Sequence, residues 1–221
     1  MATKQTMTLS FLNDVFQEIC DFAINEATPS KYCKEEQPEE SMQIHFGKFM
    51  SQWYDVLREV EIPALCKLTG SGEDRWEIDE SLQFPAIDKR MFYAAGELKF
   101  HGKEMKDRDF VAEAKEDIRR MLCVAPYFFD TTMTFTLFIS CDKQEIDDVH
   151  KYAKQQAKIK NIKVIDAPEG YFAIAIQIIP DSQEDSHAPF YGVHWKERYD
   201  YLVSTKQLKN NYFPKRVRLF L

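Results

Sequence analysis

The segment from Met133 to Cys141 constrains the fold more strongly than any other part of the chain. It reads Met-Thr-Phe-Thr-Leu-Phe-Ile-Ser-Cys, and this density of β-branched and aromatic residues predicts a strand. Asp142 follows at once, with Glu145 three positions later, which is the capping-box pattern of a helix start. A strand that leads directly into a helix predicts a fold in which the two kinds of element alternate.

This alternation extends over the second half of the chain. The residue pattern predicts a strand at 91–100, helices at 110–122 and 146–159, and strands at 163–166 and 171–179. Strand, helix and strand in succession imply crossover connections between strands of one sheet. The predicted fold class is therefore α/β, a mixed central sheet flanked by helices.

The first part of the chain has a helical pattern instead. One amphipathic helix is expected at 10–27 and a second at 41–60, where the apolar side chains recur at helical spacing, namely Phe46, Phe49, Met50, Trp53, Leu57 and Val60. Between them, residues 28–41 contain two prolines and four glutamates and are expected to form a linker or loop. We therefore divide the chain into an N-terminal helix with an acidic linker, 1–40, and an α/β core with a basic tail, 41–221.

Composition limits the class of protein. With 44% hydrophobic and 14% aromatic residues but only 7 Gly and 9 Pro, the chain can bury a large core, which excludes collagen-like, low-complexity and disordered classes. The five cysteines form no CxxC pair, so reduced thiols are expected. No apolar run approaches the roughly 18 to 20 residues of a membrane-spanning helix, and no signal peptide is recognisable. We expect an intracellular protein that does not contact a membrane.

The charge is unevenly distributed. The net charge of −7 argues against a protein coated in nucleic acid, yet the chain ends in a basic stretch without acids. Within it, Lys215, Arg216 and Arg218 follow Tyr212 and Phe213, a combination that can contact phosphates and stack on bases. The same stretch fits a C-terminal strand with solvated charges equally well.

Glu97 and Lys99 are the residues best suited to chemistry. They stand two apart in a predicted strand, so both project from one face of it. Asp88 lies nine residues before Glu97 and is separated from the strand at 91–100 by Lys89 and Arg90 only. A hairpin is expected to bring Asp88 close to Glu97. Two carboxylates and one ammonium group suit Mg²⁺ or Mn²⁺ chemistry on a phosphodiester.

This arrangement of an Asp nine positions before Glu-x-Lys, between a preceding helix and a following helix, strand and helix, resembles the PD-(D/E)xK nuclease superfamily over residues 41–141. The resemblance implies that Asp88 and Glu97 are metal ligands and that Lys99 is the catalytic lysine. It also implies that Glu59, on the second predicted helix, is a further acid. The expected function is a metal-dependent endonuclease acting on DNA or RNA.

The same residues admit an interpretation without catalysis. Glu97 and Lys99 would then form an ion pair in a partly buried strand, and the chain would be a binding or interaction module on an α/β scaffold. Fold alone does not decide between the two. The acidic sequence pI of about 5.3 favours the interaction module, or a homo-oligomer with a single basic groove. Convergence of Asp88, Glu97 and Lys99 would favour the nuclease.

Overall fold

A computed structural model of the protein describes residues 9–61, 77–87, 90–105, 108–124, 131–157 and 159–179. In chain order the helices and strands are α1 (Leu9–Asp21), a π-helical turn (Phe22–Glu26), α2 (Pro29–Tyr32), α3 (Pro38–Met50), β1 (Asp55–Glu61), β2 (Glu77–Ile87), β3 (Arg90–His101), α5 (Phe110–Val124), β4 (Thr131–Ser140), α6 (Lys143–Ala153), β5 (Ile159–Ala167), a 3₁₀ turn (Pro168–Gly170) and β6 (Tyr171–Ile178).

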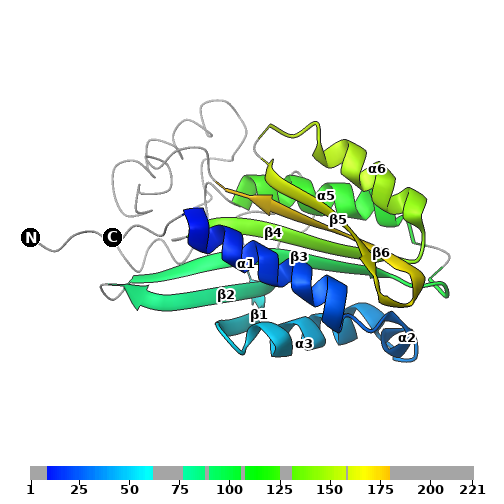
Figure 1. Ribbon diagram of the computed structural model, residues 1–221, viewed down its shortest axis with the longest axis horizontal. Coiled ribbons are helices and arrows are strands. Elements are labelled where there is room, and N and C mark those ends of the chain that lie inside the picture. The colour runs from blue at the N-terminus through cyan, green and yellow to red at the C-terminus, as the bar shows by residue number, and fades with distance from the viewer. Residues whose placement is uncertain are drawn as a thin grey trace, which may run out of the picture.

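The strands form one six-stranded sheet in the order β1-β2-β3-β4-β6-β5 (Figure 1). β3 and β4 are parallel and joined through α5, whereas every other neighbouring pair is antiparallel. Helices cover both faces, with α1 and α3 on one and α5 and α6 on the other. The predicted α/β class, with a mixed sheet flanked by helices and an N-terminal helical portion, is confirmed.

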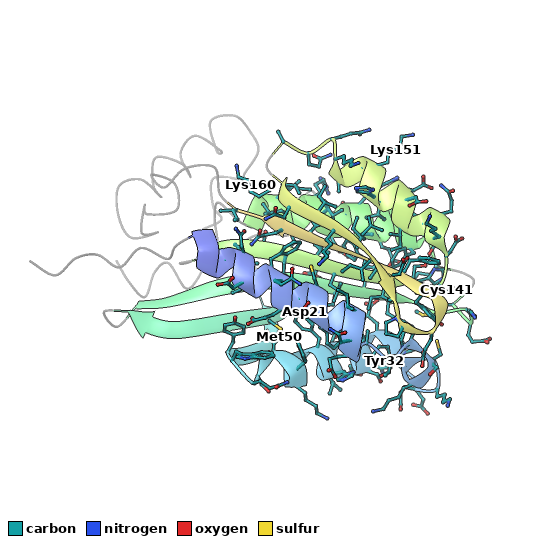
Figure 2. All side chains as sticks on the ribbon, in the orientation of Figure 1. Asp21, Tyr32, Met50, Cys141, Lys151 and Lys160 are labelled. Carbon is teal, nitrogen blue, oxygen red and sulfur yellow. The ribbon has the colours of Figure 1, made fainter. Side chains whose placement is uncertain are left out.

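Side-chain alternation along the strands builds two apolar layers, and side chains fill the space between the sheet and its helices (Figure 2). On β3, Leu98 and Phe100 pack in the cluster under α1 and α3, whereas Ala95 packs in the cluster under α5 and α6. Alternate residues of a strand face opposite sides. Glu97 and Lys99 therefore project from the same face as Ala95, towards α5.

The prediction of a helix at 41–60 is wrong for the second half of this segment. α3 starts earlier, at Pro38. Proline suits the first turn of a helix because the amide N–H that it lacks would have no hydrogen-bond partner within the helix at this position. It ends at Met50, where the Ser51 hydroxyl donates to the Lys48 carbonyl. Asp55–Glu61 is the edge strand β1, paired with β2, so Glu59 lies in a strand and not on a helix.

The segment expected to be a linker, 28–41, contains α2 and the first turn of α3. The helix expected at 10–27 is present as α1 and the π-helical turn that continues it. Its buried side chains, among them Val15 and Ile19, pack in the same cluster as Phe135 of β4. α1 thus contributes to the apolar layer on its face of the sheet.

Gly96 is required where β3 passes under the Phe135 ring. A Cβ atom built at Gly96 would lie 2.1 Å from Cζ of Phe135, well inside van der Waals contact. We expect Gly96→Ala to lower the free energy of unfolding by about 1–3 kcal/mol through overpacking, measured by urea denaturation. Adding Phe135→Leu should recover part of this loss, because the smaller side chain can move aside. An unchanged urea midpoint in Gly96→Ala would contradict the expectation.

Candidate functional site

Lys99 is held by acids from two helices. Its Nζ atom lies 3.2 Å from Oε2 of Glu113 and 3.3 Å from Oδ2 of Asp117, both on α5. Oε1 of Glu39, in the first turn of α3, lies 3.9 Å away. The Lys99 side chain is 12% exposed. Its ammonium group is therefore largely removed from water and surrounded by carboxylates.

Arg108 connects two of these acids. Its Nε donates to Oε2 of Glu113 at 2.6 Å, and its Nη1 donates to Oε2 of Glu39 at 2.6 Å. The same Glu39 oxygen accepts from the Phe100 amide at 3.2 Å. We call Lys99, Arg108, Glu39, Glu113 and Asp117 the Lys99 network. It joins α3, β3 and α5 through charge-assisted hydrogen bonds and ion pairs.

The network determines the charge state of its members. Burial alone would lower the pKa of Lys99, but the carboxylates of Asp117 and Glu39 outweigh it and raise this pKa above its usual value. Burial would raise the pKa of Glu113, yet the hydrogen bond from Arg108 and the charge of Lys99 lower it. Lys99 is therefore an ammonium cation at neutral pH, and Glu113 is a carboxylate.

Two carboxylates beside Lys99 are nearly inaccessible to water. Glu97 is 6% exposed and Asp117 is 5% exposed, and charged residues are almost never buried to this extent without partners. Glu97 and Lys99 share one face of β3, as their spacing predicted. Sequence reasoning missed Glu39, Arg108, Glu113 and Asp117.

The hairpin between β2 and β3 is present as predicted, but its turn is remote from Glu97. Ile87 pairs with Arg90, the two residues that flank the turn. Arg90 precedes Glu97 by seven residues on one strand, or roughly 23 Å at about 3.3 Å per residue. Asp88 itself lies outside the described residues, as do Lys215, Arg216 and Arg218. The register therefore does not bring Ile87 or Arg90 to Glu97.

A different acid has the register position next to Glu97. Glu80 pairs with Gly96 at the end of the β2–β3 ladder, and the same register continued by one step would lead to Asp79 and Glu97. On the other side of β2, Arg58 pairs with Glu80 and Val60 pairs with Ile78, which sets Glu59 opposite Asp79.

Glu59, Asp79 and Glu97 therefore form one row across β1, β2 and β3, which we call the acidic row. Neighbouring strands are about 4.8 Å apart, so the backbone positions of the row span roughly 10 Å. Sequence reasoning missed Asp79 because it placed the meeting point of the two strands at their turn.

An open hollow of about 400 Å³ adjoins the Lys99 network. It lies between the start of α3 and the connection from β3 to α5, and it is lined by Gln37, Pro38, Glu39, Glu40, Gln43 and Met105. Because Glu39 belongs both to this lining and to the network, the network is reached by solvent from this side.

The acidic row has the donor chemistry for a hard divalent cation. Mg²⁺ prefers oxygen ligands and is commonly bound through one or two carboxylates together with several waters. Among the side chains that the structure describes, no three His, Cys, Asp or Glu gather into a metal-binding group. Glu97 is the member of the row whose side chain the structure describes, and its carboxylate is the kind of ligand that such an ion prefers.

No helix in the described part of the chain is both long and apolar enough to cross a bilayer. Comparisons with protein-family models, with curated proteins and with solved structures gave no match to this chain. The interpretation of the site therefore depends on its residues and on the strand topology.

Proposed function

We propose that the protein is a metal-dependent nuclease that hydrolyses phosphodiester bonds at the acidic row and Lys99. The observation that supports it best is the position of Lys99 two residues after Glu97 on one face of β3, with its ammonium held by Glu113 and Asp117. The element order α3, β1, β2, β3, α5, β4 also agrees with the helix, strands, helix and strand that the resemblance to PD-(D/E)xK nucleases implies.

In this proposal Glu97 and Asp79 hold Mg²⁺ or Mn²⁺, and Glu59 is the additional acid on β1. Such an ion, when bound, polarises the phosphoryl oxygen and lowers the pKa of a water molecule that becomes the nucleophile. The carboxylates supply the negative charge that attracts the cation. Asp79 takes the place that the sequence interpretation gave to Asp88.

Lys99 is the proposed catalytic lysine. Because its pKa is raised by Asp117 and Glu39, it remains protonated and does not remove the proton from water at neutral pH. Its ammonium instead orients the attacking water and stabilises negative charge developing on the phosphoryl group. Glu113 and Asp117, which lie 3.2 and 3.3 Å from Nζ, hold the ammonium in position.

The proposed partner is nucleic acid, either DNA or RNA. Lys215, Arg216 and Arg218 are proposed to contact backbone phosphates, which position a strand without reading its sequence. Metal bound to the acidic row would offset its negative charge, which would otherwise repel the phosphates of the substrate.

Cleavage of supercoiled plasmid and of single-stranded RNA tests the proposal. The wild-type protein is expected to cleave at least one of them in millimolar Mn²⁺ or Mg²⁺ and to stop when EDTA is added. Glu97→Gln removes a metal-binding charge and keeps the shape, so it should abolish cleavage. In the wild type, Mn²⁺ at a hundredfold excess over its Kd should raise the free energy of unfolding by about 2.7 kcal/mol and so raise the melting temperature. Glu97→Gln should abolish this rise.

Glu104→Gln is the matched control, because Glu104 is exposed on the connection between β3 and α5. It should leave both cleavage and the Mn²⁺ effect unchanged. A wild-type protein that neither cleaves these substrates nor gains stability from Mn²⁺ would contradict the nuclease and favour the non-catalytic interaction module.

A further inference from the structure

Thr136 of β4 is a buried polar residue beside Glu97. The two are register partners in the parallel pairing of β3 and β4. Phe138, two residues later on β4, packs in the cluster under α5 and α6, so Thr136 projects from the same side of the sheet as Glu97. Thr136 is 0% exposed, and its hydroxyl has no hydrogen-bond partner among the residues that the structure describes. A fully buried hydroxyl thus lies next to a carboxylate.

The other neighbours of Thr136 on this face of the sheet do not explain its hydroxyl. Ile176 of β6 is its register partner on the far side, and both Ile176 and Phe138 are fully buried apolar residues. Burying a hydroxyl without a hydrogen bond costs free energy, and valine would fill nearly the same space without this cost. Buried polar groups in proteins have a protein or water partner in the large majority of cases. The position therefore indicates a hydrogen bond that involves Glu97.

Thr134, on the same face of β4, provides a comparison. It is also 0% exposed, but its Oγ1 donates to the Met121 carbonyl of α5 at 3.2 Å. Its register partner on β3 is Ala95, whose side chain has no polar atom. The two buried threonines therefore differ in their surroundings. The hydroxyl of Thr134 is bonded to α5, whereas that of Thr136 lies beside the Glu97 carboxylate.

The spacing of the strands favours a water molecule as the link between Thr136 and Glu97. Neighbouring strands are about 4.8 Å apart, which is longer than a direct O–H···O hydrogen bond of about 2.7 Å. Two such bonds through one water molecule span up to roughly 5.5 Å. A buried water needs about two to four polar partners, and these two side chains supply two of them.

We propose that the Thr136 hydroxyl and the Glu97 carboxylate hold one buried water molecule between them. This bridge fixes the direction of the carboxylate, which makes Thr136 a positioning residue for Glu97. Groups that hydrogen-bond to a metal ligand orient it and strengthen metal binding. The bridge itself belongs to the scaffold, whereas its use in holding Mg²⁺ or Mn²⁺ rests on the proposed function.

The bridge is tested without any assay of cleavage. A high-resolution crystal structure of the wild type is expected to contain an ordered water within hydrogen-bond distance of Thr136 Oγ1 and of the Glu97 carboxylate. Thr136→Val should lower the urea midpoint of unfolding, because the water loses a partner. A hydroxyl without any partner would instead be replaced by a methyl group at no loss of stability. A wild-type crystal structure without this water overturns the proposal, and so does a Thr136→Val midpoint equal to or above that of the wild type.

The Mn²⁺ dependence tests the positioning of Glu97. In Thr136→Val, the Mn²⁺ concentration that gives half of the rise in melting temperature is expected to increase about 10- to 100-fold, and the concentration for half-maximal cleavage should increase with it. Thr136→Ser keeps the hydroxyl and should stay near the wild type in both. Thr134→Val is the matched control, because it removes a buried hydroxyl from the same face that is not beside Glu97. It should leave both Mn²⁺ concentrations unchanged.

Failure of this proposal differs from failure of the proposed function. A wild-type protein that contains the water but neither binds Mn²⁺ nor cleaves contradicts the nuclease and the metal role of Thr136, while the bridge stands. An active wild type whose Thr136→Val variant needs no more Mn²⁺ overturns the positioning role and leaves the nuclease intact. An equal loss of Mn²⁺ affinity in Thr134→Val also overturns it, because the effect would then come from the packing of β4.

Discussion

Lys99→Met is expected to lower the free energy of unfolding by about 3–5 kcal/mol, the usual cost of removing one partner from a buried ion pair. The substitution keeps the length of the side chain but removes the ammonium from beside three carboxylates. One of them, Asp117, is 5% exposed and cannot turn its charge fully into water. Urea denaturation at neutral pH measures the loss.

The second substitution Asp117→Asn separates charge from packing. It removes the least exposed carboxylate of the network, so Lys99→Met/Asp117→Asn should be more stable than Lys99→Met alone. The double-mutant cycle should give a coupling energy between Lys99 and Asp117 within the usual range of about 0.5–3 kcal/mol. Lys163→Met, a half-exposed lysine of β5, is the control and should cost less than about 0.5 kcal/mol. Equal effects of Lys99→Met and Lys163→Met would mean that the Lys99 ion pairs are too solvated to matter.

The double variant also gives a clean test of catalysis at Lys99. A positioned catalytic group typically contributes about 10²- to 10⁴-fold to a rate, so a folded Lys99→Met/Asp117→Asn protein should have lost cleavage. If it cleaves as fast as the wild type, Lys99 belongs to the scaffold of α3, β3 and α5 and not to the chemistry.

Four strands of the sheet, β3, β4, β5 and β6, could be predicted because each has a pattern of its own. β4 combines β-branched and aromatic residues over Thr131–Ser140, and its successor α6 starts at an Asp142 cap whose carboxylate accepts from the Gln144 amide. The shared face of Glu97 and Lys99 followed from the two-residue period of a strand alone. These are local properties of the chain.

β1 could not be recognised in this way. Apolar residues at Met50, Trp53, Leu57 and Val60 fit a helical stripe, yet only the first belongs to α3. The segment Asp55–Glu61 is a strand because β2 supplies hydrogen-bonding partners along it. β2 is more than fifteen residues further along the chain, and a short apolar run does not reveal such a partner.

The partner of Glu97 was missed for a related reason. If the β2–β3 ladder continued without interruption from the pair Ile87 and Arg90, Glu80 would lie opposite Glu97. The ladder shifts by one residue between Phe84 and Ile87, a stretch that contains Pro85, which cannot donate to a ladder. After the shift Glu80 pairs with Gly96, so the next step leads to Asp79 and Glu97 instead. A one-residue shift exchanges the two faces of a strand.

The Lys99 network depends on tertiary contacts, because Glu39 and Arg108 are far apart in the sequence and meet only when α3 packs at the end of β3. One signal of it was present in the sequence. Asp117 stands in the apolar stripe of α5 between Ala114 and Met121, both fully buried. A charged residue at such a position needs a partner, and Lys99 supplies one.

Asp79→Asn is expected to abolish metal-dependent cleavage, whereas Asp88→Asn should leave it unchanged. The register of β2 and β3 continued by one residue leads to Asp79 and Glu97, while Arg90, just after the turn, lies roughly 23 Å from Glu97 along β3. Loss of a group that merely hydrogen-bonds to a metal ligand already costs about 10- to 100-fold in affinity or activity. Loss of a ligand itself should exceed this. Initial rates of plasmid or RNA cleavage over a range of Mn²⁺ concentrations measure both variants.

The dependence on Mn²⁺ distinguishes a ligand from a residue that only supports the fold. If Asp79 binds the ion, any activity left in Asp79→Asn should need a higher Mn²⁺ concentration, and its melting temperature without metal should equal or exceed that of the wild type, because two neighbouring negative charges no longer repel each other. Asp88→Asn should keep the wild-type Mn²⁺ profile. The reverse result, with activity lost in Asp88→Asn and kept in Asp79→Asn, would show that the active metal site is not built on the acidic row.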